Sequence, residues 1–226
     1  MRIAIGVFAE PPLPGRCKAA LLAAYGETWI AGLHAAMLRD TLDGLQFVNA
    51  DEWVVFALPG EHDASEGEAV LARHAPVPWD VVALRERERS AQMREAFDVL
   101  HARGGGADYS VVVSSGAPSS PTEPLASLLA DDDVAGKIVI GPTDEGGCYL
   151  LGAAKSSARL FEDIPWETPA VLEIMRLRCR ELTLPVVELD PWYEVDAPSH
   201  VMRLLEEMAK HPERAPRTAQ FLVTNK

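Results

Sequence analysis

The chain has 226 residues, of which 48% are hydrophobic and 24% charged, and its formal net charge is −13. This composition is typical of a globular protein with one α/β domain or two small ones, and the acidic balance argues against a nucleic-acid partner, which needs a basic face. No apolar run approaches the roughly 20 residues of a membrane helix, and the N-terminus lacks a leader pattern, so we expect a cytoplasmic protein without a membrane partner. Three cysteines without CxxC spacing argue against a disulfide framework or a structural zinc site.

The first predicted strand, at residues 2–8, runs into a stiff loop at residues 9–18 that is rich in proline. Arg16 and Lys18 stand where a helix is expected to begin, at Ala19. Because a helix N-terminus with nearby cations favours anions, the loop is a candidate phosphate site. The alternative is an ordinary connection with solvated basic side chains. The candidate binding residues of the loop are Pro14, Gly15, Arg16 and Lys18.

Helices and strands alternate through the next hundred residues. In chain order we expect a helix at 19–45, strands at 53–58, 79–84 and 109–113, a helix at 65–74 capped by Ser65, and a helix around Phe97 that ends at the glycines 104–106. The mixed-sign run at 85–89 is predicted to be a solvated face. The pattern is typical of an α/β fold.

A loop of small residues follows the fourth predicted strand, at residues 114–121. Ligands of open α/β sheets bind beyond the C-terminal ends of the strands, so Ser115 and Gly116 are candidate site residues by position. A short helix at 125–130 and three acids at 131–133 come next, and we predict these acids to be surface residues.

The sequence GPTDEGGCYLLG, at residues 141–152, connects a predicted strand at 137–140 to another at 148–154. Asp144 and Glu145 lie at the tip of the turn and are candidate catalytic carboxylates. Gly146 and Gly147 allow another segment to approach the backbone closely. The alternative is a solvated acidic hairpin turn. We interpret Cys148 as a buried small hydrophobic residue and not as a nucleophile.

The remaining elements are a loop at 161–168, a helix from about Pro169 to 182, a strand at 186–189 and a helix that begins at Ser199. The tail at 211–226 is predicted to be poorly ordered. None of the six histidines lies in a ligand-spaced pair, so we assign none a role. We expect a single domain over 1–226, with helices on both faces of a mostly parallel sheet.

Four stretches resemble a bacterial family of small GT-A-type proteins. They read FAEPPLPGRCK, VVVSSGAPSSP, GPTDEGGCYLLG, and IPWETPAVL followed by WYEVDAPSHVMRLL. The family is described as glycosyltransferase-like or nucleotide-diphospho-sugar transferase-like, and is related to nucleotidyltransferases that build molybdopterin and deazaflavin cofactors. The resemblance implies a three-layer α/β fold. It also implies transfer from a nucleotide or nucleotide-sugar donor to an acceptor, with Mg²⁺ or Mn²⁺.

The resemblance also implies roles for individual residues. Pro14, Gly15, Arg16 and Lys18 match the loop that neutralises phosphates in the family, Ser115 and Gly116 with Gly146 and Gly147 belong to its donor site, and Asp196 matches a metal ligand. The alternative for Asp196 is a position in the N-terminal cap of the helix that follows it. The sequence departs from the pattern at three places in particular. These are Glu10, where the family has lysine, Ala20, where it has arginine, and Gly116, where it has the metal-binding aspartate.

These departures leave three hypotheses open. The chain is an active metal-dependent transferase, an inactive member that serves as a binding or scaffold protein, or a member whose ligand is less charged and is recognised by Ser114, Ser115 and Ser119. The first predicts that Arg16, Asp144 and Asp196 meet above one edge of the sheet and hold a phosphate-bearing donor. The sequence does not indicate the acceptor or the oligomeric state.

Overall fold

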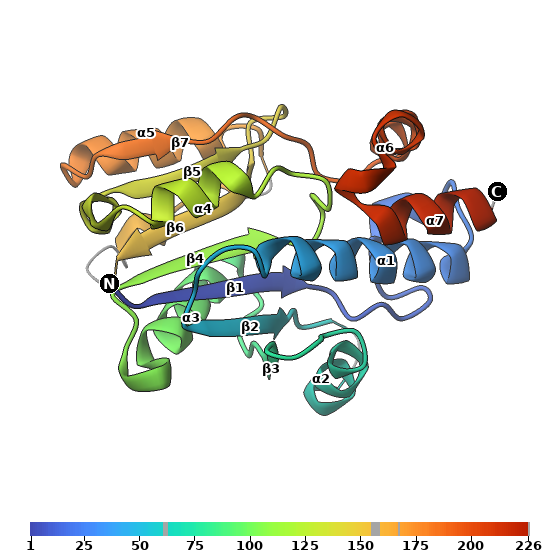
Figure 1. Ribbon diagram of the computed structural model, residues 1–226, viewed down its shortest axis with the longest axis horizontal. Helices are drawn as coiled ribbons and strands as arrows, with labels where there is room; N and C mark the ends of the chain where they lie inside the picture. The colour runs from blue at the N-terminus through green and yellow to red at the C-terminus, as the bar shows by residue number, and fades with distance from the viewer. Residues whose placement is uncertain (61–62, 155–158, 167, 226) are drawn as a thin grey trace.

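The structure is a computed structural model that describes residues 1–60, 63–154, 159–166 and 168–225. Its strands are β1 (Ile3–Ala9), β2 (Glu52–Ala57), β3 (Asp80–Ala83), β4 (Tyr109–Ser114), β5 (Ile138–Pro142), β6 (Cys148–Ala154) and β7 (Val186–Glu188). Within these ranges they form one seven-stranded sheet of order β3-β2-β1-β4-β6-β5-β7 (Figure 1). Only β6 runs antiparallel among these described strands, since it pairs in that sense with both β4 and β5. The predicted mostly parallel sheet is confirmed.

Helices cover both faces of this sheet. They are α1 (Glu27–Leu45), α2 (Ala64–Ala72), α3 (Arg89–Ala102), α4 (Glu123–Leu129), α5 (Val171–Glu181), α6 (Pro198–Lys210) and α7 (Pro216–Thr224). Side chains of β1 alternate between the two apolar layers, because successive residues of a strand point to opposite faces. Ile5 and Val7 share a cluster with Leu42 of α1, whereas Phe8 shares one with Phe97 of α3. The three-layer α/β fold follows from this alternation.

A third apolar cluster extends the molecule beyond the sheet. It joins α1, α6 and α7, and it includes Met37, Leu204 and Leu222. Figure 1 shows α6 and α7 in red beside α1, at the end toward which β1 and β4 point. The C-terminal helices therefore stand over the edge of the sheet where the candidate loops emerge.

The C-terminal segment differs from the prediction of a poorly ordered tail. Over the described residues up to 225 it contains helix α7, which buries Thr218 and Leu222. The buried Asp40 of α1 accepts hydrogen bonds from the backbone N–H groups of Arg217 and Thr218, at 3.1 and 2.7 Å. Two N–H groups that a helix start leaves without partners are thus satisfied by a residue about 180 positions away, which the local sequence does not reveal. Lys226 lies outside the described residues.

Two helix starts also differ from the prediction. The expected helix at 19–45 consists of a 3₁₀ turn, η1 (Ala19–Leu21), and of α1, which begins only after Gly26. Gly26 is extended, with φ −69° and ψ 143°, so it ends the turn and serves as the N-cap of α1. Asp63, and not Ser65, caps α2, because its carboxylate accepts the N–H of Ser65 at 2.7 Å. No described helix combines the length and apolarity that crossing a membrane requires.

The direction of winding reverses between β1 and β4, which are parallel neighbours at the centre of the sheet. Loops leave the carboxyl ends of these two strands in opposite directions, and a ligand can enter between them. The antiparallel β6 brings its first residues to the same edge, since Val113 of β4 pairs with Leu150. The loops that follow β1 and β4 and the acidic turn before β6 therefore meet at one place.

Candidate active site

A cavity of about 380 Å³ opens at this edge of the sheet. Its wall is formed by the end of β1 and the loop after it, the end of β4, the start of β6 and the segment before α6. Known small-molecule sites have volumes of about 300–1,000 Å³, so a ligand of metabolite size fits this cavity. Its polar lining includes Glu10, Lys18, His34, Arg89, Ser114, Ser115, Glu194 and Asp196.

The loop after β1 directs one of its two cations into the cavity. Lys18 has a left-handed backbone, with φ 49°, and its N–H donates to the Glu10 carboxylate at 2.8 Å. Its side chain lines the cavity. Arg16 instead forms an ion pair with Glu66 of α2 at 3.4 Å, and it is not among the described lining residues. Pro14 and Gly15 are exposed and shape the loop without lining the cavity as described.

The loop after β4 contributes mainly through its backbone and Ser115. The Ser115 side chain is buried and lines the cavity, and its N–H donates to the Phe8 carbonyl at 3.1 Å. Gly116 donates its N–H to the Ser114 hydroxyl at 3.1 Å and accepts the N–H of Val195 at 2.8 Å. The second bond ties the segment that carries Asp196 to this loop. Ser119, a candidate for recognising a less charged ligand, does not line the cavity in the described structure.

The acidic turn is held against the start of α5. Gly146 has φ +84°, and a side chain there would stand 2.1 Å from the Pro169 carbonyl oxygen. The glycine therefore permits the close backbone approach that the sequence predicts. Gly147, which lines the cavity, donates its N–H to Thr143 Oγ1 at 2.8 Å. Glu167, in the loop that leads to Pro169 and α5, lies outside the described residues.

The two carboxylates of the turn point to different partners. Asp144 forms an ion pair with Arg203 of α6 at 2.6 Å, and it is absent from the described cavity lining. Glu145 reaches His200 of the same helix, with its Oε1 2.8 Å from Nε2. Of Arg16, Asp144 and Asp196, only Asp196 is among the described lining residues of the cavity. Lys18, two residues from Arg16, lines the cavity, whereas Glu145, next to Asp144, lies outside the described lining and contacts His200.

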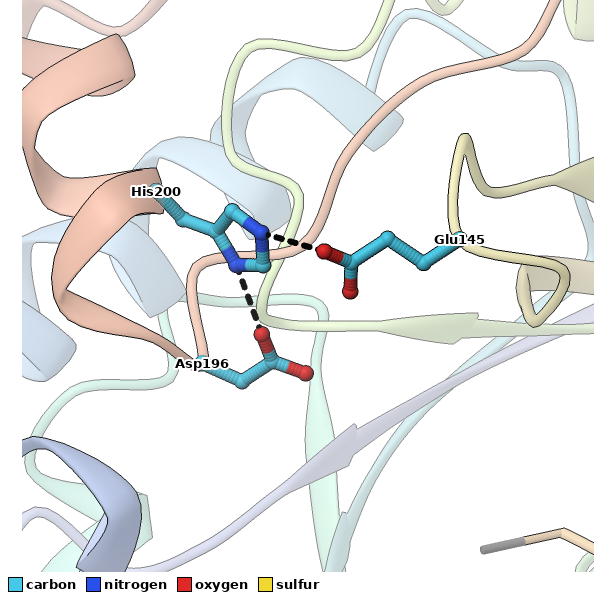
Figure 2. A group of neighbouring side chains, drawn as sticks. All are labelled: Glu145, Asp196 and His200. Atoms are coloured by element: carbon cyan, nitrogen blue, oxygen red, sulfur yellow. Dashed lines mark hydrogen bonds and ion pairs between the residues drawn. The ribbon is translucent and has the colours of Figure 1, made fainter. Parts of the chain in front are cut away.

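Glu145, Asp196 and His200 form a compact cluster at the rim of the cavity (Figure 2). His200 lies between the two carboxylates, with Nδ1 2.7 Å from Asp196 Oδ1. One ligand atom from each of the three residues lies within 4.8 Å of the others. The His200 side chain is 11% exposed, and those of Glu145 and Asp196 are 65% and 56% exposed. The cluster therefore holds two exposed carboxylates against a largely buried imidazole, and these are metal-ligating groups.

Sequence reasoning missed His200, His34, Arg89 and Glu194. The available signal for His200 was its spacing of four residues from Asp196 at a helix start. Arg89 is the last residue of a run predicted to be solvated; residues 85–88 are exposed as expected, but Arg89 is half-buried and lines the cavity. Its position could not be inferred, because it depends on where α3 begins.

Burial sets the chemical state of two missed groups. It raises the pKa of Glu194 above its ordinary value, against the opposing effects of the Lys18 charge and the Ser114 hydroxyl. It lowers the pKa of His34 to about 4, with a smaller contribution from Lys18. The His34 Nε2–H donates to the Glu10 carbonyl at 2.9 Å, so Nδ1 is an unprotonated acceptor; it has no hydrogen-bond partner among the described residues.

Cys148 lines the cavity but is not activated. Burial, with a smaller effect from the Glu194 charge, raises the pKa of its thiol to about 12. A thiol that stays protonated at neutral pH is a poor nucleophile. This agrees with the interpretation of Cys148 as a small hydrophobic residue.

Comparisons with known proteins agree with this fold. A family model described as "Uncharacterized protein conserved in bacteria (DUF2064)" matches residues 41–168. A crystal structure from Desulfovibrio desulfuricans G20, named as a "putative nucleotide-diphospho-sugar transferase", has a TM-score of 0.85 and 26% identity, covering 100% of this chain and 96% of that one. A search of curated proteins finds no match.

More distant structures share the fold alone. CMP:2-keto-3-deoxy-manno-octonic acid synthetase complexed with CTP has a TM-score of 0.58 and 13% identity, covering 93% of this chain and 100% of that one. The complex of Rv0371c from Mycobacterium tuberculosis H37Rv with manganese has a TM-score of 0.55 and 21% identity, covering 91% and 99% of the two chains.

Proposed function

This chain belongs to the bacterial DUF2064 family, and we propose that it is a transferase that uses a nucleotide-activated donor and a divalent cation. The observation that carries the proposal is the cluster of Glu145, Asp196 and His200 at the rim of a cavity that also contains Lys18. A cation-binding group near the half-buried Lys18 ammonium fits a diphosphate, because both neutralise its charge. Similar structures named for nucleotide-sugar transfer or for a CTP complex support the nucleotide.

We propose that Glu145, Asp196 and His200 hold the cation. Two carboxylates and one imidazole fit a divalent transition metal, and the imidazole favours Mn²⁺ over Mg²⁺, which prefers oxygen ligands in octahedral geometry. A similar structure is named as a manganese complex.

The protein's own residues position the donor in this proposal. Lys18 binds the phosphates through its ammonium, and the buried Ser115 fixes the edge of β4 against them. Gly147 keeps the floor of the cavity free of a side chain. The cation, when bound, supplies stabilisation of the charge that develops on the leaving phosphate. Arg16 and Asp144 remain outside this set because each is engaged in an ion pair away from the cavity.

The test compares two aspartates that lie close to the site. Asp196→Asn removes a proposed ligand, whereas Asp144→Asn removes a half-exposed carboxylate outside the cavity. We expect Asp196→Asn to weaken Mn²⁺ binding at least about 10-fold, and Asp144→Asn to leave it within about 2-fold. Calorimetric titration with MnCl₂, then with CTP, GTP, ATP, UTP and UDP-glucose, measures both steps. Equal effects of the two substitutions, or no Mn²⁺ binding by the unaltered protein, would contradict the proposal.

A second candidate function is a binding protein without turnover. Gly116 favours it, because that position lacks the carboxylate that the resembling family carries. The two functions predict the same titrations but differ in a transfer assay with radiolabelled donor. Donor hydrolysis or transfer that depends on Mn²⁺ and is lost in Asp196→Asn supports the enzyme; tight binding without either supports the binding protein.

A further inference from the structure

We propose that Lys18 and Glu194 together bind a hydroxyl group of the donor, at a subsite that exists because residue 116 is glycine. The inference rests on the proposed function and names a chemical group that the same cavity recognises. Both side chains line the cavity, one from the loop after β1 and the other from the segment before α6. Neither was predicted to act with the other.

The absence of a side chain at Gly116 leaves space in which three polar atoms lie close together. A Cβ added at Gly116 would stand 3.0 Å from Lys18 Nζ, 3.1 Å from Glu194 Oε1 and 3.3 Å from Ser114 Oγ. These distances are shorter than ordinary contacts of a Cβ, so the polar side chains fill the space that a side chain at 116 would take. The bare backbone of Gly116 thus lets an ammonium and a carboxylate approach each other on the wall of the cavity.

The two charges are close without being paired. Distances of 3.0 and 3.1 Å from one point place Lys18 Nζ and Glu194 Oε1 no more than about 6 Å apart. They are nevertheless further apart than the 4.0 Å limit of an ion pair, since the structure records none between these two described residues. A single oxygen atom with a charge-assisted hydrogen bond of about 2.7–2.9 Å to each side spans this separation.

The hydrogen-bonding properties of Lys18 and Glu194 favour a hydroxyl group in the space between them. An ammonium only donates hydrogen bonds, and an ionised carboxylate only accepts them. A hydroxyl does both, so it accepts from Lys18 and donates to Glu194. The ammonium has three N–H donors, so one N–H can hold this hydroxyl while another binds a phosphate of the donor. A phosphate oxygen placed between the two side chains would be repelled by Glu194, and an amine of the ligand would be repelled by Lys18. The group is a hydroxyl of either the ribose or the transferred sugar.

The experiment uses two glycines and matched deoxy ligands. Gly116→Ala places a methyl group in the subsite, whereas Gly136→Ala is the control because a Cβ there has no atom within 4 Å. The probes are the ribonucleoside triphosphate of the panel above that binds most tightly with Mn²⁺, its 2′-deoxy and 3′-deoxy analogues, and UDP-glucose with its 2-, 3-, 4- and 6-deoxyglucose analogues. Dissociation constants are measured by calorimetry, and melting temperatures confirm that each variant is folded.

We expect one deoxy analogue to bind the unaltered protein at least about 10-fold more weakly than its parent. Three substitutions should each weaken binding of the parent nucleotide at least about 10-fold and abolish the preference for it over that analogue: Gly116→Ala, Lys18→Met and Glu194→Ala. Gly136→Ala should change neither the affinity for the parent nor this preference. The analogue that shows the effect identifies ribose or transferred sugar as the source. Equal affinity for all analogues, or an unchanged preference in Glu194→Ala, would overturn the subsite while leaving the proposed function intact. Failure of every nucleotide to bind the unaltered protein would remove both.

Discussion

Lys18 is the residue whose backbone decides which cation reaches the cavity. Its φ of 49° lies in the left-handed region, where a residue other than glycine costs about 1–3 kcal/mol. The Glu10 carboxylate offsets part of this cost by accepting the Lys18 N–H at 2.8 Å. Glu10, which differs in charge from the residue of the resembling family, therefore stabilises the left-handed conformation of the loop at Lys18. The consequence is that Lys18 and Arg16, two residues apart, have different environments.

The first prediction compares these two cations. Lys18→Met should weaken nucleotide binding with Mn²⁺ by about 10–100-fold, because a desolvated charge-assisted contact is worth about 1.5–3 kcal/mol. Arg16→Met should change it less than about 2-fold, since it loses only a half-exposed ion pair with Glu66. Calorimetric titration of both variants measures the difference. Similar losses would mean that the loop binds phosphate through both cations.

The second prediction concerns His34 and pH. Its pKa is lowered to about 4 in the folded protein, and an unfolded chain has a histidine pKa of about 6.5. Between these values the unfolded chain binds a proton that the folded protein does not, so stability falls as pH falls through this window. Between pH 7 and pH 4.5, the free energy of unfolding of His34→Gln should fall by about 2 kcal/mol less than that of the unaltered protein. Urea unfolding at both pH values measures this.

The control for this experiment is His211→Gln, because His211 is exposed. It should keep the pH dependence of the unaltered protein. If His34→Gln also kept that dependence, the buried imidazole would not be neutral as described.

Helix α7 shows how an element is held by a distant residue. It has nine residues, too few for an isolated helix to be stable in water. Its start is satisfied by the Asp40 carboxylate of α1, and its apolar face packs into the third cluster. Because this packing also includes Leu204 of α6, the helix that carries His200 is supported by the segment that the sequence predicts to be loose.

The third prediction tests the cap. Asp40→Ala should lower the free energy of unfolding by about 1–3 kcal/mol, because it leaves two backbone N–H groups of α7 without their acceptor. Asp43→Ala removes only half-exposed ion pairs with Arg39 and Arg217 and should cost less than about 1 kcal/mol. Denaturant unfolding of both variants provides the values. A larger loss for Asp43→Ala would show that the ion pairs, and not the cap, hold α7.

At the scale of the whole molecule, three apolar clusters each stabilise a different part of the fold. Two lie on the faces of the sheet and hold the strands whose ends form the cavity. The third holds α6 and α7 against α1 and so places Asp196 and His200 opposite the acidic turn. The cluster of Glu145, Asp196 and His200, drawn in Figure 2, therefore depends on the packing of α1, α6 and α7, whose arrangement Figure 1 shows.

The fourth prediction tests how far the third cluster stabilises the folded chain, with two neighbours on α7. Leu222 is 4% exposed and Val223 is 69% exposed. Leu222→Ala should lower the free energy of unfolding by about 2–4 kcal/mol, as expected for a buried leucine, whereas Val223→Ala should change it by less than about 0.5 kcal/mol. Thermal and urea unfolding measure both. Equal effects would indicate that the third cluster does not stabilise the folded chain.

The sequence by itself determined the layer architecture and the loops that carry the site. Buried strands read as continuous apolar runs, and glycine and proline mark where they end, so β1, β4 and the turn at Gly146 were predictable from local pattern. The resemblance to a known family added the expected fold and the candidate Asp196. Both signals depend on residues that are near one another in the chain.

Only the tertiary structure decided which of two neighbouring residues takes part in the site. Lys18 and not Arg16 lines the cavity, and Glu145 and not Asp144 contacts His200, because of backbone dihedrals and of partners from α2 and α6; the order of α7 depends on Asp40. The role assigned to His200 likewise requires Glu145, which lies 55 residues away, and that of Glu194 requires Lys18 and Gly116, which belong to loops much earlier in the chain. Long-range contacts of this kind leave no periodicity in the local sequence, because each is made once, between residues whose separation is set by the path of the whole chain.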